Sequence, residues 1–476
     1  MDGFRNNLLT ITYFNAHVPC YRMAEEKREN FSGKIGFVLA AAGSAVGLGN
    51  LWRFPYLADQ YGGGIFLLVY IVLVVTFGFA MMLTETTLGR RTGKSCIDAF
   101  RDLSKKHAFI GYLAALVPII IVPYYCVIGG WVVKYFAEFS IGAGSTAADG
   151  GAFFNDFISC SLPGVFDSPV TWFLIFAGLT VLVVALGVEK GSERISKILM
   201  PVLLVLMVVI SAYALTMPGA GEGLEYYLLP DFSKFSMSTV LGALGQLFYS
   251  MSLAMGIMIT YGSYMKKSVN IEKSVRQISI VDTGVALLAG LMIVPSVAAL
   301  GMDVGSGPGL MFVTLPQVFE AMPGGELIGA LFFFLVIIAA MTSAISLAET
   351  VVSMIMDRLK WKRLISSVAV IALILGLGIL SCLGYGPLDW FTIIGQSFLD
   401  FSDFLTNSIL MPIVAILTCL FVGYVVKPKY IADEIKISGE FKFEKAYTYL
   451  VKYVCPILLT FILITGLLSF FGIYKI

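Results

Sequence analysis

The chain has 476 residues, of which 58% are hydrophobic and only 13% are charged, and its formal net charge is +1. Soluble domains carry about 25% charged residues, so we expect lipid to cover most of the apolar surface of this chain. The nearly neutral charge excludes a nucleic-acid-binding surface. Seven cysteines without CxxC spacing, together with only two histidines, argue against a structural zinc site and against a disulfide framework.

The first 34 residues predict a cytoplasmic N-terminal segment. Residues 1–22 contain no apolar stretch followed by a small-residue cleavage site, so we do not expect a signal peptide. They precede a second methionine, Met23, which opens a charged run. Two interpretations remain open: translation begins at Met23 and residues 1–22 are not native, or they form a disordered tail.

The rest of the sequence predicts an all-α polytopic membrane protein. A membrane-spanning helix needs about 20 mostly apolar residues. The apolar residues form continuous runs and do not alternate with period two, which excludes a barrel. Eleven stretches qualify as spans, at approximately 35–57, 64–88, 108–136, 170–186, 194–215, 237–262, 277–300, 326–356, 363–382, 399–425 and 447–471.

The distribution of Lys and Arg predicts the orientation, because these residues concentrate in cytoplasmic loops. With the N-terminus inside, the cytoplasmic segments hold all of the 32 Lys and Arg residues except Arg53, Lys134, Lys234 and Lys475. Eleven spans then place the C-terminus outside. We divide the chain into the N-terminal segment, a membrane-embedded core at 35–425, and a cytoplasmic loop with the eleventh span at 426–476.

Two spans contain residues that weaken a membrane helix. The first span carries Gly47, Gly49 and Asn50 near its middle, and the sixth carries Gln246 and a Ser- and Gly-containing run at 249–256. Unwound backbone at this depth is tolerated only against protein or a water-filled cavity. The alternative is that small residues simply allow close helix packing. Because the two breaks begin the two halves formed by spans 1–5 and 6–10, they predict an inverted-repeat transporter with its binding site between them.

Polar residues in other spans predict the wall of this site. The eighth span carries Thr342 and Ser343, the third Tyr124 and Tyr125, and the seventh Asp282. A carboxylate inside a span costs about 2.5–3.5 kcal/mol and is functional by default. Carbonyl, hydroxyl, amide and carboxylate oxygens are ligands for a hard cation. The alternatives are that the hydroxyls bond to their own helical turn and that Asp282 is a protonated packing residue.

The first span also carries a recognisable signature. The sequence GSAVGLGNLWRFPY at residues 43–56, followed by three glycines at 62–64, resembles helix 1 of the bacterial neurotransmitter:sodium symporters. The likeness extends from about residue 28 to the C-terminus, although many relatives have a twelfth helix that this chain lacks. The resemblance implies a 5+5 inverted-repeat fold with broken helices 1 and 6 and eleven helices, and two sodium ions as co-transported ions.

The resemblance also implies residue roles. It assigns the first sodium to Ala45, Asn50, Ser250, Asp282 and the substrate carboxylate. It assigns the second to Gly43, Val46, Ala339, Thr342 and Ser343. Substrate is expected against Ser44, Ala45, Gly47, Leu48, Gly49, Ile121, Tyr125, Tyr249, Ser250, Ser252, Met255, Ser343 and Leu347. The external gate would pair Arg53 with Asp403 under Tyr249, and the cytoplasmic gate Arg28 with Asp357 near Tyr264 and Phe31.

Some of these roles stay open from the sequence. Arg28 and Asp357 lie in charged segments where both could simply be solvated. Asp400 and Asp403 share one helix face, so either could meet Arg53. The fifth span has Gly191 and Pro201 at the Gly-x9-Pro spacing of the family, where local unwinding is expected.

Together these features predict a sodium-coupled symporter that imports a neutral, aromatic or large aliphatic L-amino acid by alternating access. Gly47 stands where monoamine carriers of the family have an aspartate, so the substrate should bring its own carboxylate. Asp282 and Ala286 replace the asparagine and serine of chloride-dependent relatives, so we expect no chloride, and no organic cofactor or obligate protein partner. The rival interpretations are a proton-coupled permease using Lys197, a membrane enzyme and a sensor.

Overall fold

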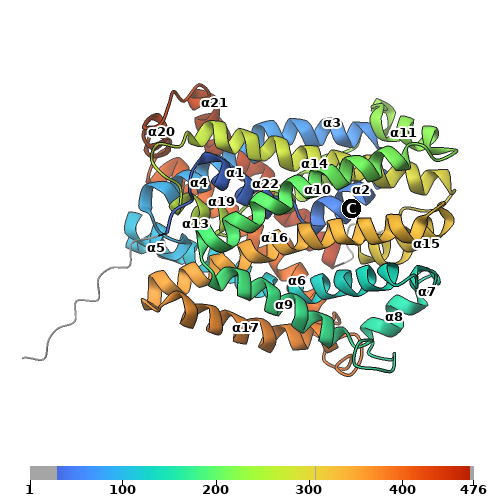
Figure 1. Cartoon of the computed structure of the whole chain (residues 1–476). Helices are drawn as coiled ribbons and strands as arrows, with labels where there is room; N and C mark the ends of the chain where they lie inside the picture. The colour runs from blue at the N-terminus through green and yellow to red at the C-terminus, as the bar shows by residue number, and fades with distance from the viewer. Residues whose placement is uncertain (1–28, 306, 472–476) are drawn as a thin grey trace, which may run out of the picture.

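The computed structural model describes residues 29–305 and 307–471. This part of the chain is almost entirely helical, with the long helices running side by side (Figure 1). It contains two isolated β-bridges, Gly63 with Pro230 and Ile393 with Gln396, and no β-strand among the described residues. Arg28 and the two candidate start methionines lie outside the described residues.

Most of the predicted spans are continuous helices. Eight are long and apolar enough to cross a membrane: Gly64–Thr92, Lys105–Ser140, Val188–Ala214, Ile271–Ala299, Gly325–Leu359, Arg363–Leu383, Phe398–Val425 and Glu444–Phe470. A ninth is a pair, Lys34–Ala45 and Gly49–Gln60, bent by 54°. The other two predicted spans are α9 (Pro169–Ala185) and a second broken helix, α12 (Met237–Ser250) with α13 (Ile257–Ser263). The described helices thus account for all eleven predicted spans.

The spans pack as two groups. The scaffold group consists of α6 (Ala108–Ser140), α9, α16 (Gly325–Leu359) and α17 (Arg363–Leu383), which pack mainly on one another. The bundle group consists of α1 (Lys34–Ala45), α3 (Gly64–Leu73) with α4 (Phe79–Thr92), α12 with α13, and α14 (Ile271–Ala299). The broken helix α1 packs on both α14 and α16. The unwound segments therefore lie where the two groups meet.

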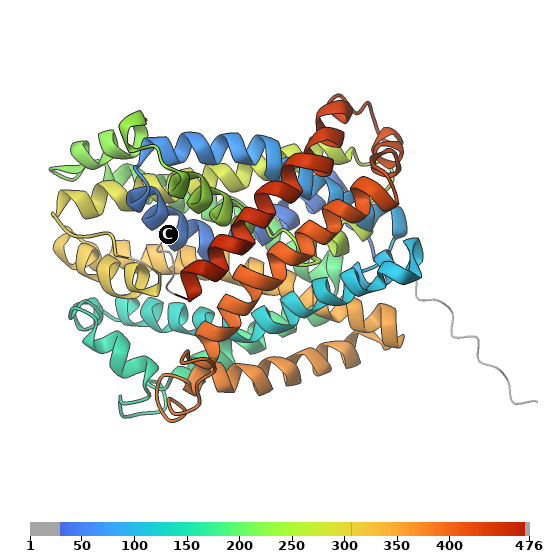
Figure 2. The ribbon, with the colours of Figure 1, turned by 180° about the vertical axis from the view of Figure 1, so that it is seen from behind.

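Two further spans flank these groups. The helix α10 (Arg194–Ala214) packs on α14 and α16. The helix α22 (Cys455–Phe470) packs on α19 (Met411–Leu420), and the two run side by side, obliquely to most of the other helices (Figure 2). Only 11% of the most apolar stretch of Glu444–Phe470 is buried within the protein, so most of this helix faces away from the other spans.

The connecting helices gather at opposite ends of the molecule. The helices α5 (Cys96–Leu103), α20 (Pro428–Lys436) and α21 (Glu444–Tyr449) lie at one end, which we name the inner end after the predicted orientation (Figure 1). The helices α7 (Gly144–Ala147), α8 (Ala152–Ile158), α11 (Ala220–Leu228) and α15 (Leu315–Ala321) lie at the other, the outer end.

Candidate functional site

The first and sixth spans are interrupted at the positions predicted. The helix α1 ends at Ala45, Val46 is extended with φ −72° and ψ 107°, and helical structure resumes with η1 (Gly49–Arg53). Between α12 and α13 the chain enters the left-handed region three times, at Ser252 (φ 52°), Ala254 (φ 58°) and Gly256 (φ 71°). Positive φ is uncommon for residues other than glycine and tends to cluster at functional sites.

The break in the sixth span is supported from α4. Glu85 is buried, and its Oε1 accepts a hydrogen bond of 2.8 Å from the backbone N–H of Ala254. The sequence-based assignment did not include Glu85, although a carboxylate in an otherwise apolar span was a signal for it.

A small cavity lies between the two breaks, closed by α6 and α16. Its volume is about 30 Å³, and it is lined by Ser44, Ala45, Gly47, Leu48, Gly49, Asn50, Ile121, Tyr125, Tyr249, Ser250, Ser252, Met255, Ile257, Ser343 and Leu347. Every residue predicted to contact substrate is among them. Asn50, predicted as a sodium ligand, and Ile257, which was not predicted, complete the lining.

One end of this cavity carries a buried polar cluster. The amide of Asn50 donates to Asp282 Oδ1 at 2.8 Å and to Ser250 Oγ at 2.9 Å, and Ser250 Oγ donates to Asp282 Oδ1 at 2.9 Å. All three side chains are buried, and no Lys or Arg of the described residues forms an ion pair with Asp282. An unpaired buried charge is costly, so this carboxylate is suited to a mobile cation.

A second oxygen cluster joins α1 to α16. The hydroxyl of Ser343 lies 3.1 Å from the carbonyl oxygen of Val46 and 3.5 Å from that of Gly43. Thr342 Oγ1 donates within its own helix to the carbonyls of Ile338 and Ala339, each at 3.1 Å. The alternative expected from the sequence, that the Thr342 hydroxyl bonds to its own helical turn, is therefore observed. The residues predicted for the second sodium nevertheless lie close together here.

Two glycines fit the backbone of the first break closely against its neighbours. A Cβ at Gly47 would lie 2.7 Å from Ser343 Oγ and 3.0 Å from the hydroxyl of Tyr125. A Cβ at Gly49 would lie 2.4 Å from the ring of Tyr249. Any side chain at either position would therefore displace the wall of the cavity.

The predicted external gate is only partly assembled. The Arg53 guanidinium lies 5.4 Å from the centroid of the Tyr249 ring, a cation–π contact. Asp403 accepts hydrogen bonds from Tyr124 (3.1 Å) and Asn407 (2.6 Å), and among the described residues it forms no ion pair with Arg53. Asp400 instead accepts from the hydroxyl of Tyr385 at 2.9 Å, so Asp403 is the aspartate that faces α6.

A larger cavity of about 410 Å³ lies on the outer side of Tyr249. Its lining includes Arg53, Tyr249, Asn407 and residues of α22 such as Thr465 and Phe470. Tyr249 lines both cavities, so its ring is the partition between them. Among the described residues the Arg53–Asp403 ion pair expected from the resemblance is not formed: Arg53 lines this vestibule, whereas Asp403 does not.

The inner end is closed by a network that the sequence did not predict. Glu349 of α16 is buried and accepts two hydrogen bonds from Arg363, of 2.7 and 3.1 Å, and a third of 2.7 Å from the hydroxyl of Tyr264. Arg363 also lies 3.3 Å from Glu29. A glutamate in the apolar run of the eighth span was a signal for this residue.

The predicted cytoplasmic gate lies beside this network. Tyr264 is a member of it, and Asp357 accepts a hydrogen bond of 2.7 Å from the backbone N–H of Ser95. The proposed partner of Asp357, Arg28, lies outside the described residues.

Residues 29–33 cross the inner end as an extended segment. Phe31 is buried and packs edge-on against Phe37, Tyr261 and Tyr264. The backbone N–H of Ser32 donates to Glu193 at 2.8 Å, and Glu29 accepts from the N–H of Val188. Both contacts involve η4 (Val188–Glu193), an irregular helical segment that contains Gly191, while Pro201 lies further along in α10.

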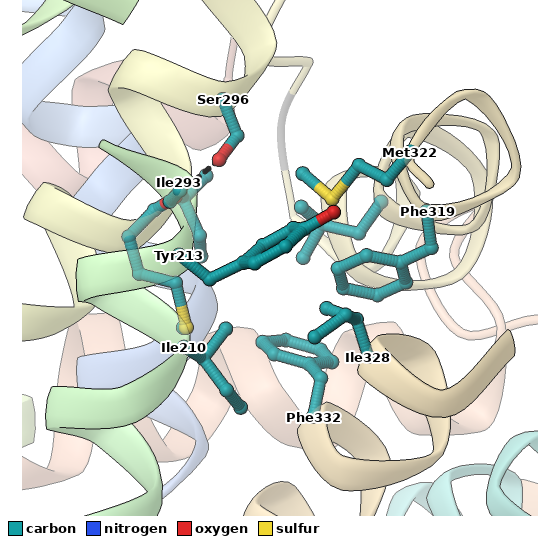
Figure 3. A pocket seen from close by; sticks show the side chains of 11 residues that line it. Ile210, Tyr213, Ile293, Ser296, Phe319, Met322, Ile328 and Phe332 are labelled. Carbon is teal, nitrogen blue, oxygen red and sulfur yellow. Dashed lines mark hydrogen bonds between the residues drawn. The ribbon is translucent and has the colours of Figure 1, made fainter. Parts of the chain in front are cut away.

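A third cavity, at the outer end, has a different character. It lies between α10, α14, α15 and α16, and its side chains are almost all apolar (Figure 3). Its volume is only about 10 Å³, roughly the space of one water molecule. We therefore place no binding site there.

Two broken helices that face each other around a buried polar cavity define an inverted-repeat membrane transporter. Comparisons with known proteins agree with this class. The profile of the sodium:neurotransmitter symporter family matches residues 28–143 and 159–474. The uncharacterized sodium-dependent transporter YhdH of Bacillus subtilis is 36% identical over 459 residues, which cover 94% of this chain and 100% of that protein.

Two further comparisons cover nearly the whole chain. An uncharacterized sodium-dependent transporter of Haemophilus influenzae is 33% identical over 458 residues, 93% of this chain and 99% of that protein. The crystal structure of MhsT in complex with L-phenylalanine matches with a TM-score of 0.83 and 36% identity, over 92% of this chain and 100% of that one.

The chain belongs to the sodium:neurotransmitter symporter family. It is therefore a sodium-dependent membrane transporter rather than an enzyme. The resemblance read from the first span and the predicted inverted-repeat helical fold are both confirmed.

Proposed function

We propose that the protein is a sodium-coupled symporter for a neutral, aromatic or large aliphatic L-amino acid, working by alternating access. The observation that carries this proposal is the cavity between the two breaks, where exposed backbone and the Asn50–Ser250–Asp282 cluster meet apolar side chains. The likeness to MhsT, whose structure was determined with L-phenylalanine, supports the same substrate class.

In this proposal two sodium ions are carried with the substrate. The first binds Asn50, Ser250, Asp282, the Ala45 carbonyl and the substrate carboxylate. The second binds Thr342, Ser343 and the carbonyls of Gly43, Val46 and Ala339, and so joins the bundle group to the scaffold group. Because the first ion and the substrate share a contact, each raises the affinity for the other, and this coupling is reciprocal.

The substrate class follows from the two ends of the cavity. Tyr125 donates to the substrate carboxylate, and Gly47 leaves no acidic side chain to replace that carboxylate. The apolar end is formed by Ile121, Met255, Ile257 and Leu347. A volume of about 30 Å³ holds roughly two water molecules, so the walls must move to admit a side chain. Met255 is suited to this because methionine repacks easily.

The remaining assignments complete the proposal. The protein lies in a bacterial inner membrane with its N-terminus cytoplasmic and its C-terminus external. Residues 35–425 form the transporter core, and residues 426–476 the cytoplasmic loop and last span. Arg53 with Asp403 gates the external side, and Arg28 with Asp357 gates the cytoplasmic side.

Uptake of labelled amino acids into proteoliposomes tests the proposal. We expect accumulation that requires an inward sodium gradient and that excess leucine or tyrosine inhibits. Isoamylamine and tyramine, which lack the carboxylate, should not inhibit. Accumulation driven by a proton gradient alone would favour the permease, and binding without any accumulation would favour a sensor.

Chloride independence is a separate part of the proposal. Asp282 supplies a fixed negative charge beside the first sodium, and Ala286 lacks the hydroxyl that an anion site would use. Uptake should persist when gluconate replaces chloride. The variant Asp282→Asn with Ala286→Ser should lose uptake in gluconate and regain it in chloride, and a wild-type rate that collapses without chloride would contradict the assignment.

A further inference from the structure

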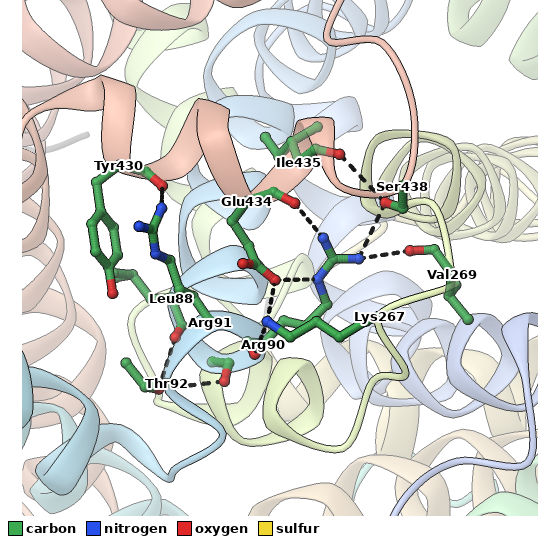
Figure 4. A network of polar contacts seen from close by, with 11 residues as sticks. Leu88, Arg90, Arg91, Thr92, Lys267, Val269, Tyr430, Glu434, Ile435 and Ser438 are labelled. Carbon is green, nitrogen blue, oxygen red and sulfur yellow. Dashed lines mark hydrogen bonds and ion pairs between the residues drawn. The ribbon is translucent and has the colours of Figure 1, made fainter.

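The loop between the tenth and eleventh spans folds back against the inner end of the bundle group. Its helix α20 packs on α4 and on η8 (Phe421–Val425). Figure 4 shows Arg90 of α4 reaching Glu434 and Ser438 of this loop and, from the loop after α13, the backbone of Val269. None of these residues lines the cavity between the breaks or belongs to either predicted gate.

Arg90 is the centre of this contact. Its side chain is fully buried, its Nε lies 2.9 Å from Glu434 Oε1, and its second terminal nitrogen donates to the carbonyl of Glu434. The other terminal nitrogen donates to the carbonyl of Val269 at 2.7 Å and to Ser438 Oγ at 3.2 Å. One guanidinium therefore joins three segments that are far apart in sequence: α4, the loop after α13, and the α20 loop.

A second set of contacts joins the loop after α13 to the α20 loop directly. Lys267 Nζ lies 2.6 Å from Glu434 Oε1, and the side-chain amide of Asn270 donates to the carbonyl of Ser438 at 3.0 Å. Glu434 is 3% exposed and accepts from both cations. Beside it, the Arg91 guanidinium stacks 3.6 Å from the centroid of the Tyr430 ring.

The same loop also reaches the inner gate. Three residues before Lys267, Tyr264 donates to Glu349 of the scaffold group, and Lys266 donates to the backbone carbonyl of Ser32. Residues 264–270 are thus held at one end by the gate and at the other by Arg90 and Glu434. A charged, fully hydrogen-bonded attachment gives one defined position, whereas apolar packing alone would allow the loop to slide.

We propose that residues 428–438 act as a clip that fixes the 264–270 loop to the inner end of α4, so that these segments move as one body and Tyr264 is held in place to close on Glu349. This inference rests on the proposed alternating access, because the clip has a role in transport only if the inner end opens and closes. Glu434 is its positioning residue, acting through Lys267 and Arg90.

Hydrogen–deuterium exchange tests the clip without reference to transport. In Glu434→Gln the neutral amide cannot pair with both cations, and we expect exchange of the 264–270 amides to rise about tenfold, the factor that corresponds to ~1.4 kcal/mol. Lys436→Gln is the matched control, since Lys436 lies on the same helix but, among the described residues, forms its ion pair with the partly exposed Glu444 and not with Glu434. Its exchange should match the wild type.

A milder variant protects the test against misfolding. Lys267→Gln removes one arm of the clip and leaves Arg90 paired with Glu434, so a smaller rise in exchange, confined to 264–270, is expected. Unchanged exchange of 264–270 in both Glu434→Gln and Lys267→Gln would overturn the clip, whatever happens to uptake.

Uptake kinetics then separate the clip from the proposed function. Glu434→Gln should lower the maximal rate of sodium-driven uptake about tenfold, in proportion to the exchange, with little change in substrate KM. A changed KM with an unchanged maximal rate would overturn the clip's role in opening. If exchange rises as expected but the wild type accumulates no amino acid, the proposed function fails and the clip stands as a structural attachment.

Discussion

The two ends of the cavity between the helix breaks are closed by different means. On the outer side a single ring, that of Tyr249, separates the cavity from a vestibule of about 410 Å³, and its contact there is a cation–π contact with Arg53. On the inner side the buried Phe31 and the Tyr264–Glu349–Arg363 network lie between the cavity and the end of the molecule.

The difference indicates which end opens more easily in this state. A cation–π contact contributes about 0.5–2 kcal/mol, whereas on the inner side one buried carboxylate, that of Glu349, accepts three hydrogen bonds, two of them from Arg363. More polar contacts of the described residues must therefore separate to open the inner side than to open the outer side.

The largest effect should come from Glu349→Ala, which removes the buried partner of Arg363 and leaves it only the partly exposed Glu29. A loss of about 3–5 kcal/mol should open the inner end and reduce sodium-driven uptake more than a hundredfold. Cys96, which is buried against Gly256, should then react with a membrane-impermeant thiol reagent applied to the inner face.

A matched double variant controls for simple destabilisation. Glu349→Leu with Arg363→Met removes both charges, and replacing a buried pair by apolar residues is often tolerated. Labelling of Cys96 should therefore be lower than in the single variant. Labelling of Glu349→Ala at the wild-type rate would refute the view that this pair closes the inner end.

The next largest effect should come from Tyr249→Leu, which removes the partition between the two cavities. The lost cation–π contact and ring area predict a fall in substrate affinity of about tenfold. Equilibrium binding of labelled amino acid measures it, and Tyr249→Phe, which keeps the ring, should stay near the wild type. Equal affinities for the Leu and Phe variants would show that the ring does not close the outer side.

A smaller change, in KM, should distinguish Arg53 from Asp403, the two charged residues of the outer side. Arg53→Gln should raise KM about threefold through loss of the cation–π contact. Asp403→Asn should change KM less, because Asp403 bonds to Tyr124 and Asn407 and not to Arg53. If Asp403→Asn has the larger effect, the Arg53–Asp403 ion pair forms in another state and limits the cycle there.

The smallest effect should come from Ile257→Val, which should change the substrate preference without altering the closure of the cavity on the outer or the inner side. Ile257 begins α13 and is stiff because of its β-branch, so it limits how far a side chain can extend beyond Met255. Ile257→Val, which removes one methylene, should shift the preference toward bulkier amino acids about fourfold, as expected for ~0.8 kcal/mol. Competition between phenylalanine and leucine measures the shift, and Ile259→Val is the control because Ile259 does not line the cavity.

The sequence predicted the spans, both breaks and the inverted-repeat fold, because glycines, amides and hydroxyls in an apolar run are direct signals of helix interruption. The resemblance supplied the lining residues. Ile257 was missed because three left-handed residues at 252, 254 and 256 reset the helical phase, and sequence spacing cannot follow a face across such a break.

The closing contacts were harder to predict for a different reason. Glu349 and Arg363 lie 14 residues apart on two helices, and only the turn between α16 and α17 brings them together. Asp403 bonds to Tyr124 and Asn407 rather than pairing with Arg53, and sequence spacing does not decide between partners on different helices. The Arg90–Glu434 contact joins residues 344 positions apart, beyond any local pattern.

The close fit of Gly49 beneath Tyr249 has a practical consequence. The aromatic ring rests where a methyl group would have to sit, so Gly49→Ala would hold the ring away from the cavity by steric exclusion alone. Such a variant would accumulate in one state of the cycle without any inhibitor. It would be a starting material for selecting conformation-specific antibodies and for determining the outward-facing structure by experiment.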